Sequence, residues 1–184
     1  MAVLVEAHSV IIRRARIMES YQGGWDNFVR NCPNQTLCAD TDLARIGFMM
    51  PIDLDVFIKC LKFMGVGYTR EGHPADYAIV SQFTGPATPC PWLLFDHAEI
   101  NGKRVAICRL VGSTENGIAL PAGWHYDGSL SASCVYVPPG AVEATMRFLR
   151  CENGVDVYQD LLTGQEVYAG RPGRWKIALE GGER

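Results

Sequence analysis

The spacing of apolar residues changes near the middle of the chain and predicts two parts with different secondary structure. In residues 1–84, strand-like apolar runs alternate with segments of helical spacing, as in a mixed α and β fold. Residues 85–184 instead contain short alternating runs separated by turn dipeptides, which indicates antiparallel hairpins. The sequence therefore predicts an α+β protein whose two parts pack together as one compact unit.

The first part begins with a strand, an interrupted helix and two short strands. Residues 3–12 are rich in β-branched side chains and predict one continuous strand. Near-helical spacing over 15–31 predicts a helix, which two adjacent glycines should break because glycine weakens a helix interior. Short strands are expected at 36–40 and 43–50, on either side of a turn.

Residues 51–65 carry the strongest helical pattern in the chain. Pro51 suits the first turn of a helix, where its missing N–H removes no hydrogen bond. The spacing places five apolar side chains on the face expected to be buried: Leu54, Phe57, Ile58, Leu61 and Met64. A strand at 76–83 completes the order β-α-β-β-α-β, which predicts a ferredoxin-like fold for residues 1–84.

Three turn dipeptides organise the second part: Asn101–Gly102, Asp127–Gly128 and Asn153–Gly154. Each lies between strand-like residues and suits a two-residue type I′ hairpin turn, so residues 85–184 are predicted to form a β-meander. Residues 141–149 alternate between apolar and polar side chains, which favours a strand, with a helix as the open alternative.

A two-residue turn fixes which residues of a hairpin face each other. In the first hairpin, Glu99 should oppose Arg104, and this pair of opposite charges supports the register. On the other face, Asp96 should lie diagonal to Arg109 among apolar neighbours. We expect a partly buried ion pair there, and the alternative is an arginine that binds an anion.

The other two hairpins make similar predictions about the faces of their strands. In the second, Trp124 and Tyr126 should share one face and His125 should point to the more apolar one. In the third, Arg147 should oppose Asp160 as an ordinary cross-strand pair.

The composition is that of an ordinary globular domain, with 48% hydrophobic and 20% charged residues and a formal net charge of −3. Nucleic-acid binding usually requires a concentrated basic patch, whereas the basic residues here are scattered. The N-terminal residues lack the basic start of a signal peptide, and no apolar stretch approaches a membrane span. We therefore expect a cytoplasmic protein that binds neither nucleic acid nor membranes.

Seven cysteines, an odd number without any C-x-x-C spacing, indicate reduced thiols rather than a disulfide framework or a structural zinc site. Cys90 lies in a loop and is the most accessible thiol by this criterion, but the sequence places no histidine beside it. Phosphate-binding loops, dinucleotide-binding glycine motifs and nucleophile elbows are absent from the sequence, so no cofactor is expected.

Two pairs of side chains have the spacing of metal ligands on one strand face. Glu6 with His8, and His97 with Glu99, are two residues apart, so each pair would point to the same side of a strand. Such pairs are also common where a strand end meets water, and a hydrogen-bonded histidine without a metal is the favoured interpretation. No metal is therefore assigned.

The seam between the two parts is the expected pocket, because ligand sites favour such interfaces. The residues predicted to line it are Glu6, His8, Trp92, Asp96, Arg109, Trp124 and His125. Without a recognisable catalytic group, they favour a non-catalytic accessory protein that binds a small molecule or a partner protein. One alternative is a small enzyme, with or without a metal, that uses Glu6, His8, His97 or His125. Another is an oligomeric scaffold, a homodimer joined through hairpin edge strands.

The segment 21–66 contains the pattern G-G-W, P-N-x-T-x-C-A-D and G-F-M in that order. With this pattern it resembles a part of small uncharacterised bacterial proteins of the type carried on mobile gene cassettes. The resemblance covers about a quarter of the chain. It implies a bacterial, cytosolic origin, and it implies no activity and no site residues.

Overall fold

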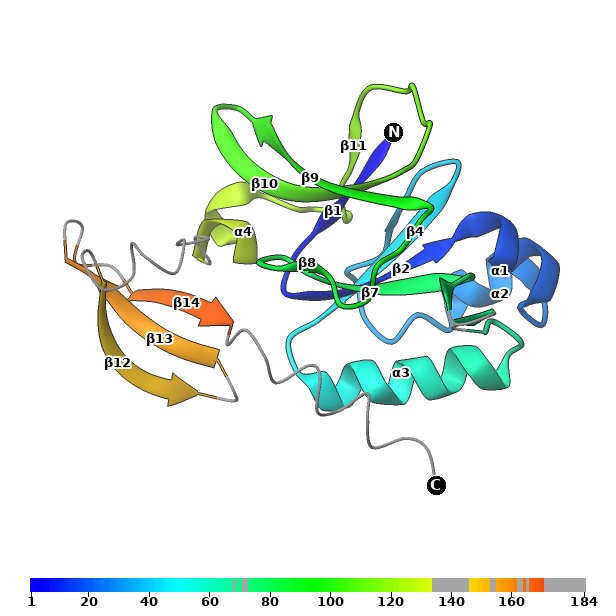
Figure 1. Ribbon diagram of the computed structural model, residues 1–184, viewed down its shortest axis with the longest axis horizontal. Helices are drawn as coiled ribbons and strands as arrows, with labels where there is room; N and C mark the ends of the chain where they lie inside the picture. Colours follow the sequence, from blue (N-terminus) through cyan, green and yellow to red (C-terminus); the bar gives the residue numbers. More distant parts are fainter. Residues whose placement is uncertain are drawn as a thin grey trace. The chain divides into compact units, whose positions relative to one another are not determined.

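The computed structural model describes residues 1–67, 69–70, 73–133, 146–152, 155–161, 164 and 166–170. The chain forms two compact units, Met1–Trp124 and His125–Arg184, and each is considered by itself below. Helices occur together with several sheets that contain antiparallel strands, so the predicted α+β class is confirmed (Figure 1).

A five-stranded antiparallel sheet forms the centre of the first unit. Its strands, in spatial order, are β3 (Cys38–Ala39), β4 (Leu43–Phe48), β2 (His8–Arg13), β7 (Tyr77–Ser81) and β8 (Gly85–Pro86). All residues of β4 and β7 are buried, as are the four central residues of β2, because other elements cover both sheet faces. These strands are therefore continuous apolar runs rather than alternating ones.

The interrupted helix predicted over 15–31 is present as two short helices. These are α1 (Arg14–Ser20) and α2 (Gly24–Arg30). Residues 21–23 separate them, and Gly23 and Gly24, at the start of α2, have φ angles of +84° and +64°. A side chain is strained in this left-handed region, so the glycine pair allows the chain to turn between the helices.

The helix predicted over 51–65 is present as α3 (Pro51–Phe63). It packs against β2 and β4 through the buried side chains of Leu54, Phe57 and Leu61. Along the chain, β2, the α1–α2 pair, β3, β4, α3 and β7 follow the expected β-α-β-β-α-β order. The ferredoxin-like assignment itself stays a prediction.

The single strand predicted over 3–12 is wrong, because this segment contributes to two sheets. β1 (Ala2–Val5) belongs to a second sheet, and the chain then bends at Ala7, whose φ angle is +49°, before β2 begins. The second sheet has the order β11 (Ile118–Ala119), β1, β10 (Lys103–Leu110), β9 (Leu93–Ile100). β1 contacts β3 and β4 and also pairs with β10, so residues from before and after position 84 pack together.

The hairpin predicted at Asn101–Gly102 is confirmed in its register. Glu99 faces Arg104 and Asp96 faces Ile107 across β9 and β10. Asn101 and Gly102 have φ angles of +51° and +73°, as a type I′ turn requires at both central positions.

The hairpin predicted at Asp127–Gly128 is wrong. Tyr126–Gly128 form a 3₁₀ turn, η1, and the short helix α4 (Leu130–Ser133) follows it. Neither turn residue has the positive φ angle that a type I′ turn needs. The backbone N–H of Ser129 donates to the carbonyl of Tyr126 at 2.9 Å, which closes the turn locally rather than across two strands.

The described strands of the second unit form an antiparallel meander of β12 (Met146–Glu152), β13 (Val155–Asp160) and β14 (Glu166–Gly170). The predicted pairing of Arg147 with Asp160 is wrong, because the register shifts between Phe148 and Arg150 and Arg147 faces Gln159 instead. The strand expected over 141–149 is present from Met146 onward, and the predicted 153–154 turn lies outside the described residues.

Two further strands of the first unit, β5 (Thr69–Arg70) and β6 (His73–Pro74), form a separate short ladder. Among the helices of the described ranges, none combines the length and the hydropathy needed to span a bilayer.

Candidate functional site, an apolar groove beside α3

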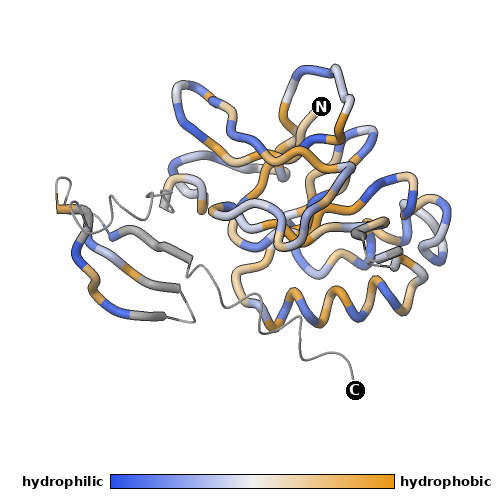
Figure 2. The backbone as a smooth tube through the Cα atoms, in the orientation of Figure 1, coloured by the Kyte–Doolittle hydropathy of each residue, from blue (hydrophilic) through white to orange (hydrophobic). Residues whose placement is uncertain are grey.

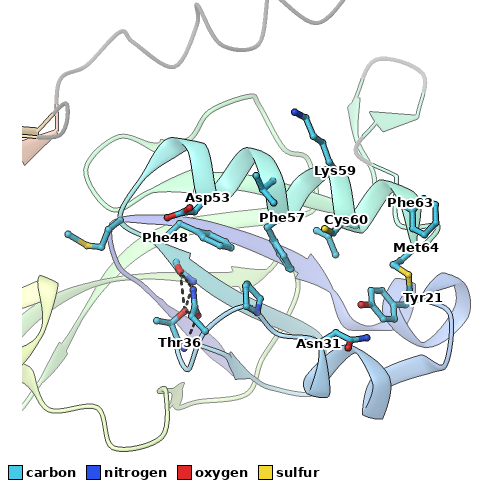
Figure 3. A pocket seen from close by; sticks show the side chains of 16 residues that line it. Tyr21, Asn31, Thr36, Phe48, Asp53, Phe57, Lys59, Cys60, Phe63 and Met64 are labelled. Carbon is cyan, nitrogen blue, oxygen red and sulfur yellow. Dashed lines mark hydrogen bonds between the residues drawn. The ribbon is translucent and has the colours of Figure 1, made fainter.

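A groove with a volume of about 980 Å³ runs along α3 in the first unit (Figure 3). Its second wall is the segment that follows α2. Most of its lining side chains are apolar or aromatic: Tyr21, Pro33, Phe48, Met49, Val56, Phe57, Leu61, Phe63 and Met64. The polar lining side chains are Asn31, Asn34, Thr36, Asp53, Lys59 and Cys60.

Hydrogen bonds to the end of β4 hold the second wall in place. The side-chain amide of Asn34 donates to the carbonyl of Gly47 at 2.8 Å. The N–H of Gly47 donates to the hydroxyl of Thr36 at 2.8 Å, and that hydroxyl donates to Asn34 Oδ1 at 2.6 Å (Figure 3). Contacts within the protein therefore hold this segment opposite α3.

Aromatic packing forms the floor of the groove and one of its ends. The rings of Phe48 and Phe57 lie 5.3 Å apart, and both side chains are buried. Tyr21 stands edge-on to Phe28 at 5.4 Å, which fixes the ring at the end nearest Asn31. The groove therefore has an aromatic floor and an aromatic side chain at one end.

The polar groups of the groove are separated along its length. Asp53 lies near Phe48, whereas Tyr21 and Asn31 lie towards the other end (Figure 3). Cys60 is an exposed thiol, and the described lining residues include no histidine that would activate it. This arrangement suits orientation of a bound molecule better than nucleophilic chemistry.

The seven residues predicted to form a site lie elsewhere, and none of them lines this groove. Glu6 is buried at the corner between β1 and β2, and its Oε1 accepts a 3.0 Å hydrogen bond from Trp124 Nε1. The Arg13 guanidinium lies 5.9 Å from the centre of the Trp92 ring. The structure thus brings Glu6 and Trp124 together.

The predicted ion pair of Asp96 and Arg109 is present at 3.5 Å. Arg109 is partly buried, with its side chain 37% exposed, whereas the Asp96 side chain is 56% exposed. Such a pair contributes little to stability. His125 is exposed and belongs to the second unit.

The strand geometry assumed for a metal at Glu6 and His8 is not present, because the chain bends at the residue between them. Burial lowers the pKa of His8 to about 4, so this imidazole is neutral near pH 7. Partial burial also lowers the pKa of His97. In the part of the chain that the structure describes, no three His, Cys, Asp or Glu side chains are grouped as metal ligands.

The thiols whose side chains are described are free. Burial raises the pKa of Cys90, and it raises the pKa values of Cys32 and Cys38 to about 11. These thiols are poor nucleophiles near neutral pH, since the reactive species is the thiolate. Cys90 is therefore not an activated cysteine.

Arg45 is the most consequential polar residue that sequence reasoning missed. It is 1% exposed and donates to Ser9 Oγ at 2.9 Å, to the Glu6 carbonyl at 2.8 Å and to the Thr36 carbonyl at 3.2 Å. It thereby ties the β1–β2 corner to the segment that forms the second wall of the groove. The sequence signal for this buried residue is that an arginine interrupts the otherwise apolar run of β4.

Sequence reasoning also missed the groove, although α3 carried a clue. Ile52, Val56 and Phe63 lie outside the predicted buried face and are apolar.

Comparison of the chain with protein-family models, with curated protein sequences and with solved structures finds no match.

Proposed function

We propose that this chain is a non-catalytic cytoplasmic protein that binds an apolar small molecule in the groove beside α3. The observation that carries the proposal is the preformed groove, with apolar walls and a few separated polar groups. This is the usual character of a small-molecule site, and a volume of about 980 Å³ is sufficient for a drug-sized molecule.

The separated polar groups specify the class of ligand further. A molecule with an apolar body would contact Phe48, Phe57 and Leu61 along the floor. A hydrogen-bonding group at its end could pair with Asn31 or with the Tyr21 hydroxyl. The ligand class is therefore an amphipathic small molecule, with most of its surface apolar.

Binding of the dye 1-anilinonaphthalene-8-sulfonate, which fluoresces in apolar sites, tests this proposal. The Cys60→Phe substitution adds a ring at a position that lines the groove and should weaken dye binding at least about tenfold. The control is Met18→Phe, which adds a ring at an exposed position of α1 outside the groove. Equal dye affinity in both variants would contradict the proposal.

The exposed Cys60 thiol provides a second measurement on the unmodified protein. A bound molecule should slow its reaction with a maleimide, since the same groove holds both. The other thiols with described side chains are half-buried or buried, so Cys60 should react first. A reaction rate that saturating dye leaves unchanged would place the dye elsewhere.

A further inference from the structure

The helix α3 is apolar on two sides. Its inner side chains are buried against the sheet, whereas Ile52, Val56 and Phe63 are 63%, 53% and 88% exposed. Apolar side chains therefore recur all along the helix, separated by charged ones (Figure 2). We call these three exposed residues the outer stripe.

The outer stripe has the geometry of a helix-packing surface. Its residues are four and seven positions apart, so they lie on one face of the helix, opposite Leu54 and Leu61. Exposed apolar residues that form a continuous patch usually mark an interaction site. The charges beside the stripe identify what covers it.

We propose that a second copy of this chain covers the outer stripe, with the two α3 helices antiparallel about a two-fold axis. In this arrangement Ile52 packs against Phe63 of the partner subunit, and Val56 lies near the axis. The contact is isologous, since each helix supplies the same stripe. It differs from a dimer through hairpin edge strands.

Charge complementarity selects a second copy in this orientation. Asp55 and Lys62 are exposed on the flank of α3 away from the groove, and Lys59 lies between this flank and the stripe. A two-fold axis perpendicular to the helices places the same flank of each copy on the same side of the contact. The two helices run in opposite directions there. Asp55 then faces Lys59 and Lys62 of the partner subunit, and the pairing occurs twice.

A parallel pair of helices would lose this complementarity. In a parallel pair, the flank that carries Asp55 in one copy would lie beside the flank that carries Asp53 in the other copy. The two residues would be at nearly the same level along the helices. Two carboxylates would then approach each other at the N-terminal end. Like charges at a contact are unfavourable, so the antiparallel arrangement is preferred.

Charge reversal in two matched variants tests the proposal by sedimentation equilibrium. The wild type should sediment as a dimer, at twice the chain mass of 20.3 kDa. Asp55→Lys makes this flank wholly basic, and the double substitution Lys59→Asp with Lys62→Asp makes it wholly acidic. Each variant alone should dimerise at least about tenfold more weakly, and an equimolar mixture should restore the dimer mass.

Restoration by mixing shows that both variants are folded, because an unfolded chain would not form the heterodimer. A monomeric wild type would overturn the proposal and leave the stripe to a different protein. A dimer that neither variant weakens would also overturn it and point to the hairpin edges.

The proposal of a dimer and the proposal of a ligand site can be tested separately. Val56 and Phe63 belong both to the outer stripe and to the groove lining, whereas Ile52 belongs to the stripe alone, so Ile52→Lys is the variant that separates the two sites. This variant should be monomeric and should bind the dye at least as tightly as the wild type, because the second copy no longer covers Val56 and Phe63. Loss of dye binding in the monomer would show that the groove needs the second copy, whereas a dimeric Ile52→Lys variant would contradict the α3 contact.

Discussion

The indole Nε1 of Trp124 donates a 3.0 Å hydrogen bond to the buried carboxylate of Glu6, and the two residues are 118 positions apart. Glu6 lies where the chain leaves β1 and bends towards β2, and Arg45 binds the carbonyl of the same residue. The corner between the two sheets of the first unit is therefore held through both the backbone and the side chain of Glu6.

Replacement of Trp124 by phenylalanine should destabilise the first unit by about 1–3 kcal/mol, because it removes a donor to a buried carboxylate while an aromatic ring remains. Urea denaturation monitored by far-ultraviolet circular dichroism measures the change. Trp25→Phe is the control, because the half-buried Trp25 ring packs on Phe28 and on the Arg14 guanidinium. Equal free energies of unfolding in the two variants would show that the hydrogen bond contributes nothing specific.

Gly47 lies against the buried guanidinium of Arg45. A Cβ atom at this position would clash with Arg45 Nη2. The guanidinium cannot retreat easily, since it makes three hydrogen bonds in a buried site. Gly47→Ala should therefore destabilise the unit by about 1–3 kcal/mol, measured as a change in the free energy of unfolding.

A double-mutant cycle with Arg45→Leu isolates the cause of this effect. The single Arg45 substitution should cost about 1–3 kcal/mol for each buried acceptor that it leaves unsatisfied, on Ser9, Glu6 and Thr36. In the Arg45→Leu background the methyl group of Gly47→Ala no longer meets the guanidinium, so its cost should fall by at least about 0.5 kcal/mol. The same cost in both backgrounds would attribute the effect to the backbone of Gly47 instead. Arg104→Leu, at an exposed strand position, should change stability by less than about 0.5 kcal/mol.

The sequence predicts those features that depend on local chemistry. The register of β9 and β10 follows from Asn101–Gly102, because a two-residue turn leaves one pairing. The same reasoning failed at Asp127–Gly128, where the dipeptide adopts a 3₁₀ turn with no strand partner across it. A turn dipeptide thus identifies where the chain can reverse and leaves open whether two strands flank it.

Features that depend on distant contacts were not predictable in this way. The bend at Ala7 lies between two apolar strands, and the polar residues Glu6 and His8 beside it fit one continuous strand as well as a bend. The groove exists because Asn34 and Thr36 bond to Gly47, which brings a loop opposite α3. The sequence of α3 shows more apolar residues than one buried face needs. It does not show which segment of the chain lies opposite them.

The pKa of His8 provides a pH-dependent test of its burial. Burial disfavours the charged imidazolium and lowers the pKa from an ordinary value of 6.5 to about 4 in the folded protein. Between these values the unfolded chain binds more protons than the folded one. The contribution of His8 is therefore complete above about pH 6.5 and is lost as the pH falls towards 4.

The expected loss is at most about 3 kcal/mol, from about 1.4 kcal/mol per pKa unit, and partial exposure of His8 reduces it. Urea denaturation of the wild type and of His8→Gln at several pH values between 4 and 7 separates this loss from the titration of carboxylates common to both. The difference in the free energy of unfolding between the two proteins should shift in favour of the variant as the pH falls. A difference between wild type and His8→Gln that stays constant over this range would mean that His8 accepts a proton as readily in the folded protein as in the unfolded chain.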